Sequence, residues 1–166
     1  MFVVAHFILI VDKQKVMKLS QYNNSWMVHI IHELAHIFLG SINTRLPIWL
    51  EEGICEYYSK QYNTFGFLNP ENKIRPVNFK QIESLIQNSY FDASNAETKL
   101  SLFYWQSHSF VRFLVKYWGE KKISDCIQSA GLKYDFYFLF NRIYSRSFEK
   151  IEKEWLLSLG LSHASQ

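Results

Sequence analysis

Apolar residues recur at helical spacing after the first 22 positions of the chain. Positions 23–25 hold Asn, Asn and Ser, which commonly cap the N-terminus of a helix, and Gly40 is of the type that ends one. Between them the apolar side chains stand three or four positions apart, which predicts one helix with a single apolar face. We expect that face to consist of Trp26, Ile30, Leu34 and Ile37.

A second helix is predicted over residues 48–60. Pro47 stands where this helix begins, at a position that needs no N–H donor. Gly53 lies inside the helix, where glycine costs about 1 kcal/mol relative to alanine. A glycine at this position indicates that the backbone of another element approaches closely.

The second half of the chain also has helical periodicity. A long aromatic helix is expected first, and shorter helices should follow it, the last of them opened by Ser147 as its N-cap. The expected ranges are about 98–118, 121–130, 134–144 and 147–159.

Two other segments have different patterns. Residues 2–11 are rich in Val, Ile and Phe and have the length of a strand. Residues 61–77 form the longest loop, because they contain several Asn, Gly and Pro residues. After this loop, Asn78 with Gln81 resembles a capping box that opens a short helix to about residue 88.

Together these elements predict an α+β fold that is predominantly α, with a minimal N-terminal strand or hairpin followed by a helical bundle. A chain of 166 residues is long enough to bury one core, so we expect a single domain over residues 1–166. Its parts are a strand region, a helix pair, a loop with a short helix, and the C-terminal helices, at residues 1–22, 23–61, 62–97 and 98–160.

Composition excludes several classes of protein. The hydrophobic fraction of 48% is typical of a packed protein, and a net charge of +3 is too small and scattered to indicate nucleic-acid binding. Cys55 and Cys126 form no C-x-x-C pair, which argues against a cysteine zinc site or a disulfide framework. No apolar window has the length of a membrane helix, and the apolar start lacks the basic region of a signal peptide, so a cytoplasmic location is favoured.

The stretch HELAH at residues 32–36 has the pattern of a metal site. His32 and His36 are four positions apart, so on a helix both imidazoles lie on one face and can reach a single ion. In metalloproteases with the pattern H-E-x-x-H the intervening glutamate is a general base and not a ligand. The pattern therefore makes Glu33 a candidate general base.

A catalytic zinc ion usually has three protein ligands and one open position. We expect the third ligand from the second helix, on which Glu51, Glu52 and Glu56 all lie. If the Trp and Leu before them pack toward the core, Glu52 and Glu56 share a face that Cys55 borders. Cys55 is then expected near the metal without binding it, and the three carboxylates remain alternatives at this point.

HELAH followed by PIWLEEGICEY resembles the gluzincin metallopeptidases, the peptidase MA-like group that includes thermolysin-like and aminopeptidase-N-like enzymes. Their second motif reads roughly W-L-x-E-G-x-A-x-Y. The matching residues here are Trp49, Leu50, Glu52, Gly53 and Tyr57. The resemblance covers about residues 26–159 and implies a zincin-like catalytic domain that hydrolyses bonds in a peptide or protein substrate.

The resemblance also implies roles for individual residues. Glu52 is the expected third ligand, which leaves Glu51 and Glu56 as surface or outer carboxylates. One Zn²⁺ held by the two histidines and Glu52 is expected to activate a water molecule, whose proton Glu33 takes as general base.

A gluzincin also needs a donor for the oxyanion of the tetrahedral intermediate, commonly Tyr or His. Tyr104 and His108 are four positions apart in the long aromatic segment, so they share a helix face and both are candidates. The short region before the first helix leaves two alternatives open. One is a zinc-binding scaffold or binding domain without catalysis, and the other is a fragment of a larger peptidase.

Overall fold

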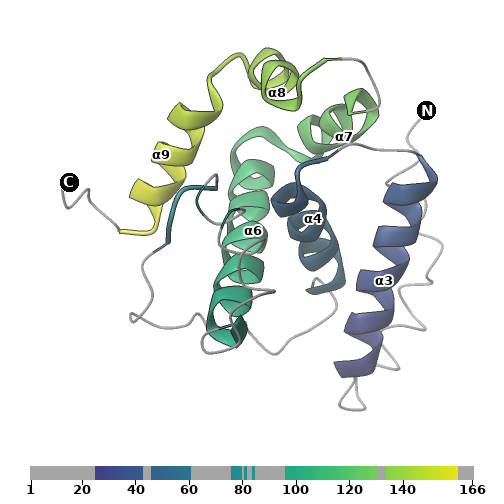
Figure 1. Cartoon of the computed structure of the whole chain (residues 1–166). Coiled ribbons are helices and arrows are strands. Elements are labelled where there is room, and N and C mark those ends of the chain that lie inside the picture. Colours follow the sequence, from purple (N-terminus) through teal and green to yellow (C-terminus); the bar gives the residue numbers. More distant parts are fainter. Residues whose placement is uncertain are drawn as a thin grey trace.

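The computed structural model describes residues 25–42, 46–60, 76–79, 81, 84, 96–130 and 134–160. These residues form a predominantly helical fold without a strand among them, which confirms the helical part of the predicted class (Figure 1). The predicted strand at residues 2–11 and most of the predicted loop at 61–77 lie outside the described residues. The named helices are α3 (Ser25–Ser41), α4 (Ile48–Lys60), α6 (Ala96–Trp118), α7 (Glu120–Ser129), α8 (Phe136–Tyr144) and α9 (Phe148–Ser158).

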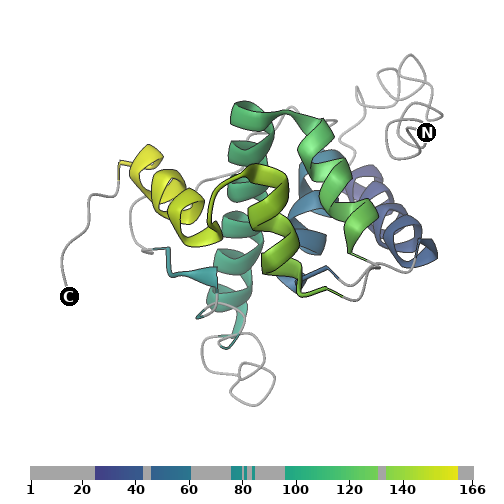
Figure 2. The ribbon, with the colours of Figure 1, turned by 90° about the horizontal axis from the view of Figure 1, so that it is seen from above.

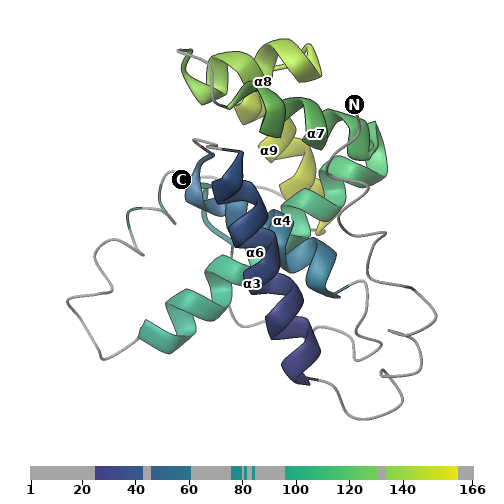
Figure 3. The ribbon, with the colours of Figure 1, turned by 90° about the vertical axis from the view of Figure 1, so that its right-hand side faces the viewer.

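The long helix α6 lies at the centre of the arrangement, and α4 packs between α6 and α3 (Figure 1). The view from above shows α9 on the opposite side of α6 from α3 (Figure 2). Figure 3 shows the right-hand side of the molecule as seen in Figure 1, and there α3 lies in front of α4 and α6. The helix that carries HELAH therefore forms an outer layer, and its inner side faces α4.

The close packing of α4 on α6 depends on Gly53. A Cβ atom at this position would lie 2.6 Å from the carbonyl oxygen of Ser107 and 2.7 Å from Cγ2 of Val111. Both distances are far below van der Waals contact, so any side chain would force the two helices apart. The predicted close approach of another backbone at Gly53 is confirmed, and the partner is α6.

An aromatic cluster joins α4 and α6 to α9. Trp49 of α4 is fully buried, and its ring centroid lies 4.6 Å from that of Phe79 and 5.3 Å from that of Phe110 in α6. Trp155 of α9 completes the cluster with its ring 5.3 Å from Phe110. Burial of such large rings dominates the energetics of a core, so this cluster fixes the face that α4 turns inward.

The predicted apolar face of α3 is wrong. Ile30, Leu34 and Ile37 are 45%, 36% and 68% exposed, whereas Ile31 and Leu39 are buried. The side chain of Trp26, the fourth predicted member, is not described. Because α3 presents its two histidines to α4, the stripe that enters the core is the one directly beside them, and the predicted stripe faces outward.

Predicted caps at two later helix starts are present. The Ser147 side chain accepts a hydrogen bond from the backbone N–H of Lys150, so Ser147 is the N-cap of α9 as predicted. Oδ1 of Asn78 accepts one from the N–H of Gln81 at 2.8 Å, as the capping pattern predicted. Both bonds satisfy a backbone donor that lacks a partner within the helix.

Candidate metal centre

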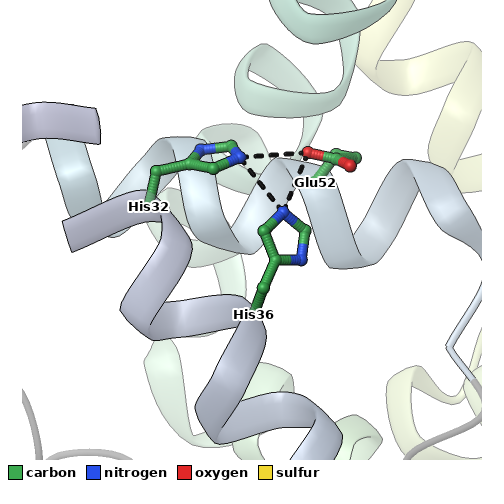
Figure 4. A group of neighbouring side chains, drawn as sticks. All are labelled: His32, His36 and Glu52. Atoms are coloured by element: carbon green, nitrogen blue, oxygen red, sulfur yellow. Dashed lines mark hydrogen bonds and ion pairs between the residues drawn. The ribbon is translucent and has the colours of Figure 1, made fainter. Parts of the chain in front are cut away.

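Three side chains from α3 and α4 converge on one point (Figure 4). His32 and His36 project from successive turns of α3, because residues four apart lie on the same side of a helix. Glu52 reaches them from α4, whose orientation is set by the buried Trp49 and Leu50. The sequence predicted this same trio as the ligand set.

The distances between the three facing atoms are nearly equal. Nε2 of His32 and Nε2 of His36 lie 3.1 Å apart, and Oε2 of Glu52 lies 3.3 Å from each of them. In a tetrahedral zinc site, ligand atoms about 2.0–2.2 Å from the ion are about 3.3–3.6 Å from one another. The described triangle therefore has the size and the two-nitrogen, one-oxygen composition of such a ligand set.

The outer nitrogens of both histidines face carboxylates. Nδ1 of His36 lies 2.9 Å from Oε1 of Glu51, and Nδ1 of His32 lies 3.2 Å from Oε1 of Glu56. An ionised carboxylate only accepts hydrogen bonds, so each Nδ1 carries the proton when the imidazole is neutral. Each Nε2 then directs a lone pair toward the other and toward Glu52. Three electron-rich atoms at this separation repel one another, and a cation between them would relieve that repulsion.

The side chains of the cluster are buried to different degrees. The side chains of His32 and Glu52 are 13% and 16% exposed, whereas those of His36 and Glu51 are 25% and 36% exposed. Oε2 of Glu52 is buried and has no hydrogen-bond donor among the described residues. A buried carboxylate oxygen is normally hydrogen-bonded or bound to a cation, and this one faces two imidazole nitrogens, as a metal ligand does.

Glu33, the predicted general base, follows His32 on α3 and is exposed. It lies near enough to Cys55 that its negative charge helps to raise the pKa of that thiol. Burial is the largest cause of this raised pKa, and the charges of Glu52 and Glu51 add to it. Cys55 is fully buried, and the described group of His32, His36 and Glu52 does not include it.

The two predicted oxyanion donors occupy different surroundings. Tyr104 of α6 is half-buried, and its ring centroid lies 6.3 Å from that of His32. His108 lies one turn further along α6, where its ring centroid is 6.4 Å from that of Tyr57. Tyr104 is therefore the neighbour of a candidate ligand, while the role of either residue stays a prediction.

The contacts of Glu51 and Glu56 with the histidines were not predicted individually. The sequence indicated only one of these two contacts. Glu56 lies one turn after Glu52 and therefore shares its helix face. Glu51 precedes Glu52 by one residue and points about 100° away from it on the helix. Its contact with His36 depends on the distance and angle between α3 and α4, which spacing along the chain does not reveal.

The comparisons with known proteins add no relative. No protein-family model, no curated protein and no solved structure matches this chain. Within the described part of the chain, every helix is too short or too polar to cross a membrane.

Proposed function

We propose that this chain is a zinc metallopeptidase of the gluzincin type, which hydrolyses bonds in peptide or protein substrates. The observation that carries the proposal is the convergence of His32, His36 and Glu52, whose facing atoms lie 3.1–3.3 Å apart. Two histidines and one carboxylate form a known catalytic zinc set that leaves a position open for water or substrate. The resemblance of both motifs to gluzincin sequences supports the choice of reaction.

Each residue then has a distinct task. His32, His36 and Glu52 hold the ion, which supplies a Lewis acid that acidifies water and polarises a carbonyl group. Glu33 accepts a proton from the attacking water and delivers it to the departing amine. Its exposed position suits both transfers, because substrate must enter from solvent. Tyr104 donates its hydroxyl proton as a hydrogen bond to the carbonyl oxygen when that oxygen becomes negative.

The test is hydrolysis of a mixed peptide library by the purified chain, followed by mass spectrometry of the products. The expected result is cleavage that stops when a chelator removes the metal and returns when zinc is supplied. The preparation must be free of contaminating proteases, so Glu33→Gln is purified and assayed in parallel. Cleavage that persists in the chelator, or equal cleavage by Glu33→Gln, would overturn the proposed peptidase mechanism.

The same geometry supports a second candidate, a zinc-stabilised scaffold domain. Its support is the ligand triangle itself, since the three atoms can hold an ion whether or not a reaction follows. Bound zinc that raises the thermal midpoint, together with no cleavage of any library peptide, would favour the scaffold over the peptidase.

A further inference from the structure

We infer that an open cavity between α7 and α8 binds small organic anions in which an oxyanion group carries a short apolar chain. The two helices lie side by side (Figure 1). The cavity between them has a volume of about 460 Å³, and small-molecule sites usually measure about 300–1,000 Å³. Its walls come from α7, from α8 and from Ser145, the C-cap of α8, and no residue of the candidate metal centre is among them.

The charges along the cavity favour an anion. Two cationic side chains, Lys122 and Arg142, line it together with one carboxylate, Asp125. Both carboxylate oxygens of Asp125 accept hydrogen bonds from Nζ of Lys121, at 2.9 and 3.0 Å, so this negative charge already has a partner. The guanidinium group of Arg142 has no hydrogen bond or ion pair within the described part of the chain. An unpaired cation beside a cavity raises the local concentration of anions.

Lys122 argues against a cationic ligand at the same place. Its Nζ donates a hydrogen bond to the carbonyl oxygen of Ile143, in the last turn of α8. The free carbonyl groups of a helix C-terminus attract cations, and here the ammonium group of the chain itself already satisfies one of them. An ammonium group has three N–H donors, so two donors of Lys122 remain for a ligand.

The other lining groups define the class of anion. The planar guanidinium group of Arg142 can donate two parallel hydrogen bonds to the oxygens of one carboxylate or phosphate group. Ser129 and Ser145 add hydroxyl donors to the same cavity. Leu139 and Ile143 contribute apolar surface, which a bare inorganic ion would leave uncovered. The lining therefore matches an oxyanion that carries an apolar chain.

The experiment titrates the full chain with four probes by calorimetry, in a buffer that contains no phosphate or carboxylate. Hexyl phosphate and hexanoate present the two oxyanions on an apolar chain, inorganic phosphate presents the anion alone, and hexylammonium presents the chain with a positive charge. We expect hexyl phosphate or hexanoate to bind at least about tenfold more tightly than inorganic phosphate, because burial of a few methylene groups contributes that much. Which of the two binds more tightly distinguishes a phosphate ligand from a carboxylate ligand. Failure of both to bind, or equal binding of hexylammonium, would overturn the inference.

Variants of Arg142 test whether the anion binds in this cavity. Arg142→Gln should weaken binding of the tighter probe by about tenfold, because it loses charge-assisted hydrogen bonds. Arg142→Lys keeps the charge without the planar fork, so it should lose less. The matched control is Arg112→Gln, since Arg112 is an exposed arginine of α6 that does not line the cavity. Unchanged affinity in Arg142→Gln, or an equal loss in Arg112→Gln, would overturn the inference. Thermal melts verify that each variant is folded.

The candidate metal centre needs its own control, because a bound zinc ion also attracts phosphate and carboxylate groups. Glu52→Ala removes one candidate ligand and leaves the lining of the cavity as it is. We expect this variant to bind the tighter probe within twofold of the unchanged chain. A loss in Glu52→Ala as large as that in Arg142→Gln would assign the anion to the metal centre and overturn the inference. The result does not depend on peptide hydrolysis, so the inference and the proposed function can fail separately.

Discussion

Gly53 and Ser107 meet where α4 crosses α6, and a Cβ atom on Gly53 would lie 2.6 Å from the carbonyl oxygen of Ser107. Gly53 directly follows Glu52 in the sequence. The contact that holds Gly53 against α6 therefore also helps to position the backbone of Glu52, the third candidate ligand. The packing of the fold and the geometry of the candidate centre therefore depend on the same residue.

We expect Gly53→Ala to destabilise the protein by about 1–3 kcal/mol, because the added methyl group meets backbone that cannot move aside. The measurement is urea unfolding at equilibrium. Gly40→Ala is the matched control, since Gly40 is also helical and a Cβ there meets nothing within 4 Å. That control should be neutral or more stable by up to about 1 kcal/mol. Equal stability changes in the two variants would contradict the packing described for Gly53.

Glu33→Gln should keep its zinc and lose turnover. The amide preserves the size of the side chain but cannot accept a proton, and general acid–base catalysis typically contributes about 10²–10⁴-fold in rate. Zinc content and kcat for the best library peptide are measured on the same preparation, with Glu149→Gln as the exposed control. A kcat close to that of the unchanged chain would remove Glu33 from the mechanism.

Tyr104→Phe should lower kcat by about 10²–10³-fold at unchanged zinc content, because one donor to the developing negative charge is lost. His108→Gln is the comparison, since the ring of His108 lies 6.4 Å from that of Tyr57, whereas the ring of Tyr104 lies 6.3 Å from that of His32. We expect the smaller effect there. A larger drop in kcat for His108→Gln than for Tyr104→Phe would exchange the two roles.

Stability should fall at alkaline pH because of the buried thiols. Burial raises the pKa of Cys126 from 9.0 to about 12, and burial also raises the pKa of Cys55. Between about pH 9 and pH 12, the Cys126 thiol has lost its proton in the unfolded chain and keeps it in the folded chain. The free energy of unfolding therefore decreases as pH rises. Each such thiol contributes a slope of about 1.4 kcal/mol per pH unit.

The check is urea unfolding at several pH values between about 8 and 11, with the unchanged chain and Cys126→Ala side by side. The variant lacks one of the thiols, so its stability should decline less steeply with pH. If stability declined equally steeply with pH in both proteins, the Cys126 thiol would have the same pKa in the folded and the unfolded chain. That result would contradict the prediction.

Much of the helix pair was predictable from local spacing. The four-residue separation of His32 and His36 determines a shared face once α3 is helical, and Gly53 indicated a close backbone contact before its partner was known. The exposed stripe of α3 was not predictable in this way. Ile30 and Ile31 are both apolar, and only the position of α4 decides which of them is buried.

Contacts between distant segments needed the structure for the same reason. The N–H of Phe79 donates a hydrogen bond to Oε1 of Glu152 at 2.8 Å, across 73 positions of the sequence. The pairing of Glu51 with His36 likewise depends on where two helices lie side by side. Spacing along one helix carries no information about that distance.

The central claim is that His32, His36 and Glu52 bind one metal ion, and metal content tests it most directly. Plasma mass spectrometry of the purified chain, supplied with zinc and then freed of excess, should give about one zinc per chain. Glu52→Ala should retain much less, while Glu149→Ala should match the unchanged chain. No zinc in the unchanged chain, or the same zinc content in Glu52→Ala, would contradict the account.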